Sequence, residues 1–160
     1  MPLNVGDKLP TATVFHMTES GPSGVSTDEL FANKKVVMFA VPGAFTPTCS
    51  AAHLPGFAVN ADAIKAKGVD AIVCMSVNDP FVMAVWGQSQ NADAIQMVAD
   101  PGAELTKAMG LDIDLSGPGL GVRSKRFAAV VDNGVVTDLA VEASPPEHTV
   151  SSAESVLERL

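Results

Sequence analysis

Cys49 is the residue of this sequence whose surroundings most favour chemistry. It lies in the segment 42–50, PGAFTPTCS, directly after an apolar run that ends at Val41. Thr46 followed by Pro47 is a typical helix start, so Cys49 falls in the first helical turn. Unpaired backbone amides and the positive end of the helix dipole favour a thiolate there, and the thiolate is the nucleophilic form of cysteine. A small cysteine that only packs is the other interpretation, but the flanking hydroxyl groups favour chemistry.

A second candidate feature is a basic cluster in an acidic chain. The sequence has 10 Lys and Arg against 18 Asp and Glu, a net charge of −8, and yet Arg123, Lys125 and Arg126 lie close together. A guanidinium stays charged and offers a planar fork of N–H donors, which suits the stabilisation of negative charge in a reaction. The alternative is a solvated strand edge that discourages aggregation, and the residues alone favour this alternative.

Three further features carry weaker signals. His53 lies on the same helical face as Cys49, but one Cys and one His do not form a metal-ligand spacing, so no metal site is expected. The segment 117–121, GPGLG, lacks the spacing of a phosphate-binding loop, and no cofactor is expected. Thr46 stands where the first cysteine of a C-x-x-C pair would be, which argues against a dithiol oxidoreductase.

The apolar pattern predicts the strands that position these segments. Continuous apolar and β-branched runs at 35–41 and 70–77 predict two strands covered on both faces, and Cys74 lies inside the second. Residues 18–24 are expected to form turns. Asn133-Gly134 is the strongest short hairpin signal in the chain. The remaining strands are predicted at 12–17, 96–99, 126–131 and 135–141.

Capping motifs predict where the helices begin. Ser26 and Ser151 each open a capping box, in which the hydroxyl accepts from the amide three residues later. Asp79-Pro80 and Asp100-Pro101 each predict an N-cap followed by a first-turn proline. The longest helix is expected to kink at Pro55-Gly56. The predicted helices are a short one through Leu30 and Phe31, those at 47–66 and 81–88, one from Asp100-Pro101 to Met109, and one ending at Leu160.

Strands and helices alternate through the middle of the chain, and an antiparallel hairpin and a helix follow. A β-α-β succession implies parallel strands joined by a right-handed crossover, whereas the hairpin adds antiparallel strands. The predicted fold is therefore a three-layer α/β domain with a mixed central sheet, whose strand order the pattern does not determine. No repeat or linker interrupts the pattern, so residues 1–160 are predicted to form a single domain.

Composition excludes several classes of function. Of the 160 residues, 47% are hydrophobic and 18% charged, so the chain can bury a sizeable core and is not disordered as a whole. A net charge of −8 argues against nucleic-acid and anionic-membrane partners. No apolar run is long enough for a transmembrane helix, and no signal peptide is visible. Two cysteines are too few for a disulfide-stapled secreted fold, so a reducing, cytoplasmic location is expected.

The segment around the first cysteine resembles a known active-site signature. PGAFTPTCS at 42–50, followed by HLPGF at 53–57, is similar to the signature of the peroxiredoxins, specifically their type II (five-type) branch. The resemblance continues through 67–87, 98–101 and 123–134 and so covers nearly the whole chain. It implies a thioredoxin-like α/β/α fold with an N-terminal strand extension. It also implies a thiol peroxidase that reduces hydrogen peroxide and organic hydroperoxides to water and alcohols.

The resemblance assigns roles to three residues of the signature. Cys49 matches the peroxidatic cysteine, whose thiolate attacks the peroxide O–O bond and becomes a sulfenic acid. Thr46 matches the threonine whose hydroxyl contacts the thiolate and the substrate oxygen. Pro42 matches the proline that shields the pocket and the sulfur.

Three basic residues take roles from the same resemblance. Arg126 matches the arginine that stabilises the thiolate and holds the peroxide. Arg123 matches a second arginine of that segment, and a supporting role is expected for it. His53 accompanies the signature and is expected to support the site from behind.

The resemblance also bears on how Cys49 is reduced again. Cys74 matches a second cysteine found in members of the branch that depend on glutaredoxin or glutathione. A thiol inside a buried strand is hard to ionise and to move, so core packing is slightly favoured over a resolving role. An external thiol, glutathione with glutaredoxin or else thioredoxin, is therefore expected as the reductant. Residues 141–160 contain no cysteine, which excludes the C-terminal resolving cysteine of some relatives.

Two expectations concern partners and the class of function. Trp86 and residues 81–85 are predicted to be helical, and the family resemblance places a homodimer contact near them. The alternative to a peroxidase is a slow redox sensor that uses oxidation of Cys49 as a signal. A peroxidase turns over many peroxide molecules per chain with a physiological reductant, whereas a sensor needs to react only once.

Overall fold

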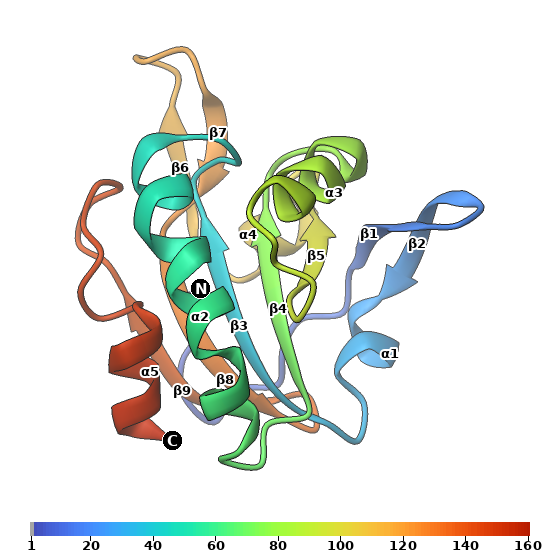
Figure 1. Cartoon of the computed structure of the whole chain (residues 1–160). Coiled ribbons are helices and arrows are strands. Elements are labelled where there is room, and N and C mark those ends of the chain that lie inside the picture. The colour runs from blue at the N-terminus through green and yellow to red at the C-terminus, as the bar shows by residue number, and fades with distance from the viewer. Residues whose placement is uncertain (1) are drawn as a thin grey trace.

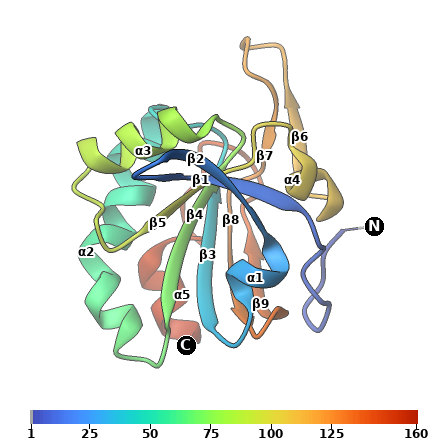
Figure 2. The ribbon, with the colours of Figure 1, turned by 90° about the vertical axis from the view of Figure 1, so that its right-hand side faces the viewer.

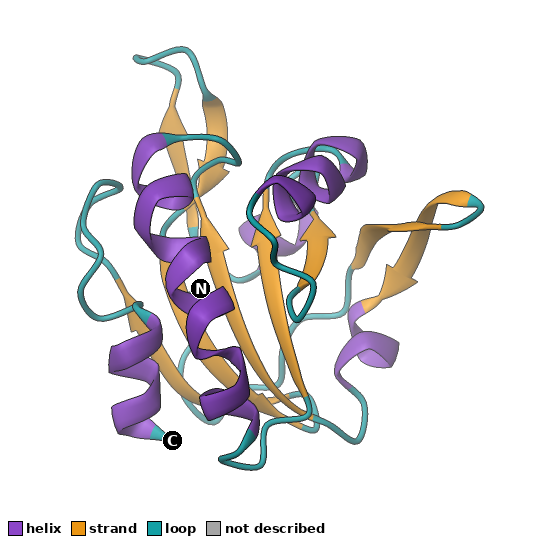
Figure 3. Ribbon diagram, viewed as in Figure 1, coloured by secondary structure: helices purple, strands orange, loops and turns teal. Residues whose placement is uncertain are grey.

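The computed structural model describes residues 2–160, in which seven strands form one mixed sheet (Figures 1 and 3). These strands are β1 (Thr13–Thr18), β2 (Gly21–Ser26), β3 (Lys35–Val41), β4 (Ala71–Ser76), β5 (Gln96–Ala99), β8 (Phe127–Asp132) and β9 (Val135–Val141). Their order is β2-β1-β5-β4-β3-β8-β9. The pairs β3–β4 and β4–β5 are parallel and the others antiparallel, which confirms the predicted mixed sheet.

Helices cover both faces of this sheet and complete the three layers (Figure 2). The helices are α1 (Thr27–Phe31), α2 (Leu54–Lys65), α3 (Pro80–Ser89), α4 (Glu104–Ala108) and α5 (Ala153–Arg159). Side chains alternate along β3, so that Phe39 stacks on Phe57 of α2, with ring centroids 4.0 Å apart, while Met38 faces the cluster containing Leu105 of α4. Within residues 2–160, no helix is both long and apolar enough to cross a membrane.

The N-terminal extension is a hairpin rather than one strand and a turn-rich segment. Residues 18–24 were predicted to form turns, but β2 begins at Gly21 and pairs along its whole length with β1. Glycine is rare in strands, so the local pattern hides this one. Gly24 faces Phe15, and a Cβ at position 24 would lie 3.3 Å from that ring. Close packing between Gly24 and Phe15 therefore favours a strand here, although the local sequence pattern does not.

A second, two-stranded sheet was not predicted from the sequence pattern. It consists of β6 (Asp112–Leu115) and β7 (Gly121–Ser124), which pair antiparallel and project beyond the central sheet (Figure 1). The segment 117–121 therefore includes the tip of this hairpin. Its strands are four residues each and carry few β-branched residues, which explains why no strand was predicted there.

Two of the predicted helix starts hold, with one change of partner. The Asp79 carboxylate accepts from the amide of Val82 at 2.8 Å, as an N-cap does. Ser26 also caps its helix, but its hydroxyl accepts from the amide of Asp28 rather than that of Glu29. The Asn133-Gly134 hairpin is confirmed as well, since both residues adopt the positive φ that such a turn requires.

The other two helix starts were wrong, since the N-cap lies three residues later than predicted for α4 and one residue later for α5. Helix α4 begins at Glu104, because the buried Asp100 carboxylate reaches forward to the amides of Leu105 and Thr106 instead of capping its own turn. Helix α5 is capped by Ser152, since the Ser151 hydroxyl is committed to another carboxylate.

The long helix that follows Pro47 does not kink at Pro55-Gly56. The irregularity lies one turn earlier, in a π-helical turn η1 (Cys49–His53), where the amide of Leu54 donates to the carbonyl of Cys49. Pro55 has no N–H to donate to the preceding turn. The wider π-helical turn directly before it accommodates this missing hydrogen bond. Such turns often occur at functional sites.

Candidate active site

Cys49 lies where β3 has ended and the following helix begins, at the carboxyl edge of the sheet. The amide of Ser50 donates to the carbonyl of Thr46 at 2.9 Å, which makes this the first helical hydrogen bond. Cys49 is therefore in the first turn, as predicted. The carboxyl ends of parallel strands are the usual place for sites in open α/β sheets.

Two donors meet at the Cys49 sulfur. Thr46 Oγ1 lies 2.9 Å and Arg126 Nη2 lies 3.1 Å from Sγ, and the cysteine is fully buried. The Thr46 hydroxyl also lies 2.7 Å from the carbonyl of Gly43. Its single proton serves one acceptor at a time. When Cys49 is a thiolate, the Thr46 hydroxyl donates to the sulfur. When Cys49 is a thiol, the Thr46 hydroxyl donates to the carbonyl of Gly43, and the S–H group can donate to the Thr46 oxygen.

Arg126 is held on three sides, with only 2% of its surface exposed. Nε donates to the carbonyl of Pro145 at 3.0 Å, Nη1 meets His53 Nδ1 at 2.9 Å, and Nη2 reaches Cys49. Within residues 2–160, Arg126 forms no ion pair with a carboxylate. Its buried positive charge therefore faces the sulfur, which stabilises a thiolate.

His53 supports Arg126 rather than the sulfur. A guanidinium can only donate, so His53 Nδ1 accepts from Arg126, and Nε2 carries the proton and donates to the carbonyl of Ser151 at 2.9 Å. Burial, and then the charge of Arg126, lower the pKa of His53 to about 3. His53 is therefore a neutral acceptor that orients Arg126.

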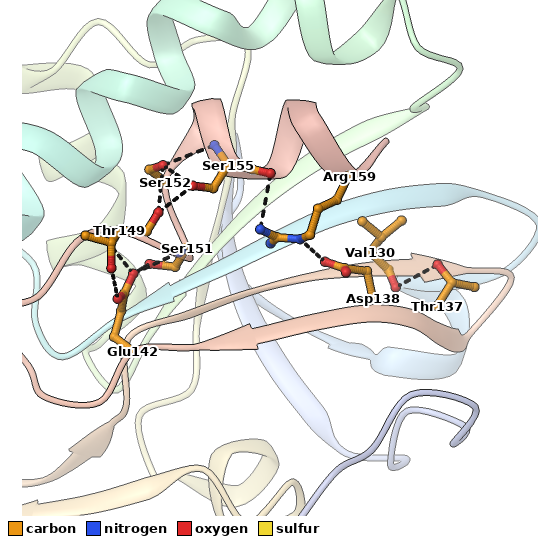
Figure 4. Close-up of polar contacts among 9 residues, drawn as sticks. All are labelled: Val130, Thr137, Asp138, Glu142, Thr149, Ser151, Ser152, Ser155 and Arg159. Atoms are coloured by element: carbon orange, nitrogen blue, oxygen red, sulfur yellow. Dashed lines mark hydrogen bonds and ion pairs between the residues drawn. The ribbon is translucent and has the colours of Figure 1, made fainter.

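Glu142 is a part of the site that the sequence pattern missed. Its buried carboxylate accepts from the amides and hydroxyls of Thr149 and Ser151, at 2.6–3.0 Å (Figure 4). Burial alone would raise the pKa of Glu142, but these hydrogen bonds outweigh it and lower the pKa to about 2. Glu142 thereby fixes Ser151, whose carbonyl holds His53. A lone Glu after a strand gives no sequence signal of this role.

A cavity of about 240 Å³ opens beside Thr46 and Arg126, the two residues that contact the sulfur, although Cys49 itself is not part of its lining. Pro42, Thr46 and Arg126, three of the predicted site residues, line one part of it. The rest of the wall is apolar and was not predicted. It consists of Pro47, Thr48 with its methyl group, Leu115 and Leu120 from the β6–β7 hairpin, and Pro145 and Pro146.

The two remaining predicted residues do not touch the sulfur through hydrogen bonds. Arg123 donates to the carbonyls of Leu120 and Pro42, at 2.8 and 3.2 Å. Cys74 is fully buried in the middle of β4, and both cysteines are free thiols. Within residues 2–160, no cluster of His, Cys, Asp or Glu is arranged to hold a metal ion.

A thioredoxin-like sheet that sets a cysteine between an arginine and a hydroxyl at a helix start defines a thiol-dependent oxidoreductase. Comparisons with known proteins narrow this class. Residues 4–157 match the Redoxin family. The chain is 48% identical to Peroxiredoxin-2D of Arabidopsis thaliana over 161 residues, covering 99% of each chain.

Solved structures give the same result. The crystal structure of reduced Prx3 from Vibrio vulnificus in complex with hydrogen peroxide is 54% identical, with a TM-score of 0.94 over 98% of each chain. Peroxiredoxin 5 from Alvinella pompejana is 31% identical, with a TM-score of 0.86 over 98% of this chain and 97% of the other. The chain belongs to the peroxiredoxin family, in its type II branch. It is a thiol-dependent peroxidase.

Proposed function

We propose that Cys49 is the peroxidatic cysteine and that Arg126 and Thr46 are its two catalytic partners. The observation that carries this assignment is the pair of donors at 3.1 and 2.9 Å from one sulfur, beside a cavity that the same two residues line. Pro42 completes the wall that a peroxide must pass to reach the buried sulfur.

The reaction follows from this geometry. The Cys49 thiolate attacks one peroxide oxygen, so that an S–O bond forms while the O–O bond breaks. Sulfur is oxidised to the sulfenic acid, and the leaving oxygen takes a proton to become water or an alcohol. Negative charge moves from sulfur to that leaving oxygen, and fixed donors aimed at the charge lower the barrier. Arg126 and Thr46 can donate hydrogen bonds to this negative charge as it moves from the sulfur to the leaving oxygen.

Hydrogen peroxide and organic hydroperoxides are the proposed substrates. The apolar part of the cavity supports the second group, because an alkyl or aryl substituent gains by leaving water for an apolar wall. The peroxide group itself needs only the sulfur and its two donors.

An external thiol is proposed to reduce the sulfenic acid. Glutathione attacks the sulfur, releases water and leaves a mixed disulfide, which a second thiol, from glutaredoxin or another glutathione, reduces to Cys49 and a new disulfide. Thioredoxin is the alternative reductant. The burial of Cys74 supports an external thiol, and two free thiols fit a reducing, cytoplasmic location.

A homodimer is proposed through the face formed by Phe45, Phe81 and Val85. These large apolar side chains are 55%, 60% and 56% exposed, and Phe45 lies near Trp86, with ring centroids 6.4 Å apart. Analytical ultracentrifugation of Phe81→Asp should give monomers. Val59→Asp is the matched control, since Val59 is even more exposed but lies on α2. Monomeric wild type would refute the dimer.

A turnover assay tests the enzymatic proposal. Purified wild type and Cys49→Ser receive hydrogen peroxide with glutathione and glutaredoxin, or with thioredoxin and its reductase. We expect many turnovers per chain with glutathione and glutaredoxin, and none from Cys49→Ser. Full activity of Cys49→Ser would refute the assignment of the cysteine, and a single turnover with every reductant would favour a redox sensor.

A further inference from the structure

Arg123 joins two walls of the substrate cavity without touching the reacting sulfur. Nε donates to the carbonyl of Leu120 at 2.8 Å, and Nη1 donates to the carbonyl of Pro42 at 3.2 Å. Leu120 and Pro42 are far apart in the sequence, since Leu120 lies in the β6–β7 hairpin and Pro42 directly follows β3. Both residues line the cavity. One side chain therefore links the apolar wall to the loop that carries the signature.

The active-site loop is shaped to receive this side chain. A Cβ at Gly43 would lie 2.8 Å from Arg123 Nη1, closer than carbon and nitrogen atoms approach without a shift. Glycine at position 43 thus leaves the space through which the guanidinium reaches Pro42. The contact is built into the loop and is not a chance approach of a surface arginine.

The link matters because the hairpin has little other support on this side. Among the hydrogen bonds of residues 2–160, the one from Arg123 to Pro42 is the only one that joins the hairpin to residues 42–48. The hairpin projects away from the central sheet (Figure 1). Leu115 and Leu120 are tied to each other, since the amide of Leu120 donates to the carbonyl of Leu115 at 2.9 Å. They therefore move together.

We propose that Arg123 is a positioning residue that sets the width of the apolar half of the cavity and thereby the preference for organic hydroperoxides over hydrogen peroxide. This inference rests on the proposed function of Cys49. Hydrogen peroxide carries no organic group, so it gains nothing from contact with either leucine. A bulky hydroperoxide buries its organic group against Leu115 and Leu120, so only its binding depends on where the hairpin stands.

The experiment compares two peroxides on the reduced enzyme. The chain has one tryptophan, Trp86, whose indole N–H donates to the Ser50 hydroxyl at 3.0 Å, next to Cys49. Its fluorescence in a stopped-flow instrument therefore reports oxidation of Cys49. The measured quantity is the ratio of the second-order rate constants for cumene hydroperoxide and hydrogen peroxide.

We expect Arg123→Ala to lower this ratio by about 10-fold, the lower end of what one methylene contact in an apolar pocket is worth. Arg123→Lys keeps the charge but not the planar fork, so it should lower the ratio in the same direction. Lys125→Ala removes a neighbouring positive charge that makes no side-chain hydrogen bond among the described residues, and it should leave the ratio unchanged.

Leu120→Ala is the second variant, because it removes the wall itself. It should lower the ratio, and adding Arg123→Ala to it should lower the ratio little further, since both changes act on one wall. The proposal would be overturned if Arg123→Ala lowered the rate constants for both peroxides equally, or neither of them, so that their ratio stayed unchanged. A wild-type ratio in Arg123→Lys would overturn it as well. Failure of the proposed function looks different, because then Cys49→Ser would react with peroxide as fast as wild type.

Discussion

The two cysteines of this protein are equally buried and yet lie in opposite environments. Both are fully inaccessible and belong to the same core cluster. Cys49 opens a helix and receives hydrogen bonds from Thr46 and Arg126. Cys74 lies in the middle of β4, paired with Phe39 of β3 on one side and Met97 of β5 on the other. Within residues 2–160, its sulfur has no hydrogen-bond donor.

This contrast shows that hydrogen-bond donors, and not exposure, distinguish the surroundings of the two cysteines. Burial raises the pKa of the Cys74 thiol well above its ordinary value, and the charge of Cys49 raises it further. The backbone amides around Cys74 are used by the neighbouring strands. At Cys49 the helix start leaves amides unpaired, and a guanidinium supplies a full charge. The same apolar core thus holds one cysteine with a charged donor at its sulfur and one whose sulfur meets no donor among the described residues.

The largest effect is expected from removing the Arg126 guanidinium, because Cys49 then loses its charged donor and its surroundings resemble those of Cys74. Arg126→Ala should slow the reaction of reduced enzyme with hydrogen peroxide by about 10²- to 10³-fold, as loss of one oxyanion donor does. The stopped-flow rate constant measures it. Arg126→Lys should recover only part of the rate, because one ammonium cannot reach Cys49, His53 and Pro145 together.

Lys125→Ala is the matched control for Arg126→Ala, since it removes one positive charge from the adjacent position. Thermal unfolding shows whether each variant is folded. If folded Arg126→Ala reacts at the wild-type rate, the buried guanidinium does not assist the reaction, and the contrast between the cysteines does not depend on Arg126.

The sequence predicted the Cys49 side of this comparison because its determinants are local. Thr46, Pro47 and Cys49 lie within one helical turn, and the apolar run before them identifies the strand. The contact with Arg126 spans 77 residues of sequence, and it was expected only through the family resemblance. Charge and composition alone favoured a solvated strand edge for the arginines.

The supports behind the site could not be predicted, because they depend on which distant segments meet. His53 and Ser151 are 98 residues apart, and nothing in either segment indicates the other. The serine that was expected to cap α5 serves Glu142 instead, and the cap moved to Ser152. The hairpin that carries Leu115 and Leu120 was missed because a short strand rich in turn residues leaves no periodic signal.

A smaller effect is expected from the carboxylate that fixes the C-terminal side of the site. Glu142→Gln keeps the shape, but its NH₂ group cannot accept, so some of the donors on Thr149 and Ser151 lose their partner. Through Ser151 and His53, the change should loosen Arg126 and slow peroxide reduction by about 10-fold. Glu154→Gln, an exposed change in the first turn of α5, is the control. Equal rates in the two variants would contradict this support.

The histidine behind Arg126 predicts how stability depends on pH. Its pKa is lowered from 6.5 to about 3 in the folded protein, so below pH 6.5 the unfolded chain binds a proton that the folded chain does not. The free energy of unfolding should therefore be highest above that pH. It should fall on acidification by at most about 1.4 kcal/mol per pH unit for this group.

Urea unfolding between pH 7 and about pH 5.5 measures this dependence above the pH at which Glu142 of the unfolded chain begins to bind a proton, since its ordinary pKa is 4.5. His53→Gln keeps an acceptor for Arg126 and a donor for Ser151 without the titration, and it should flatten the curve. His148 has a pKa lowered by burial and then by Arg126, and it contributes a remaining slope. An unchanged slope in His53→Gln would show that His53 is not held neutral in the folded protein.

The smallest effect on catalysis is expected at Cys74. With glutathione and glutaredoxin, Cys74→Ser and Cys74→Ala should turn over within about twofold of wild type, because a buried thiol of raised pKa supplies little thiolate to attack a sulfenic acid. Two variants are needed, since serine adds a hydroxyl to an apolar core and alanine does not. Both should unfold at lower denaturant concentration than wild type.

Disulfide mapping completes this test of the contrast between the cysteines. After one equivalent of peroxide and no reductant, wild type should carry oxidised Cys49 and free Cys74. A bond between them needs the two Cα atoms within about 7 Å and their Cβ atoms turned toward each other, and Cys74 is fixed by paired strands on both sides. A mapped Cys49–Cys74 disulfide, with turnover lost in both Cys74 variants, would show that burial does not keep Cys74 out of the reaction.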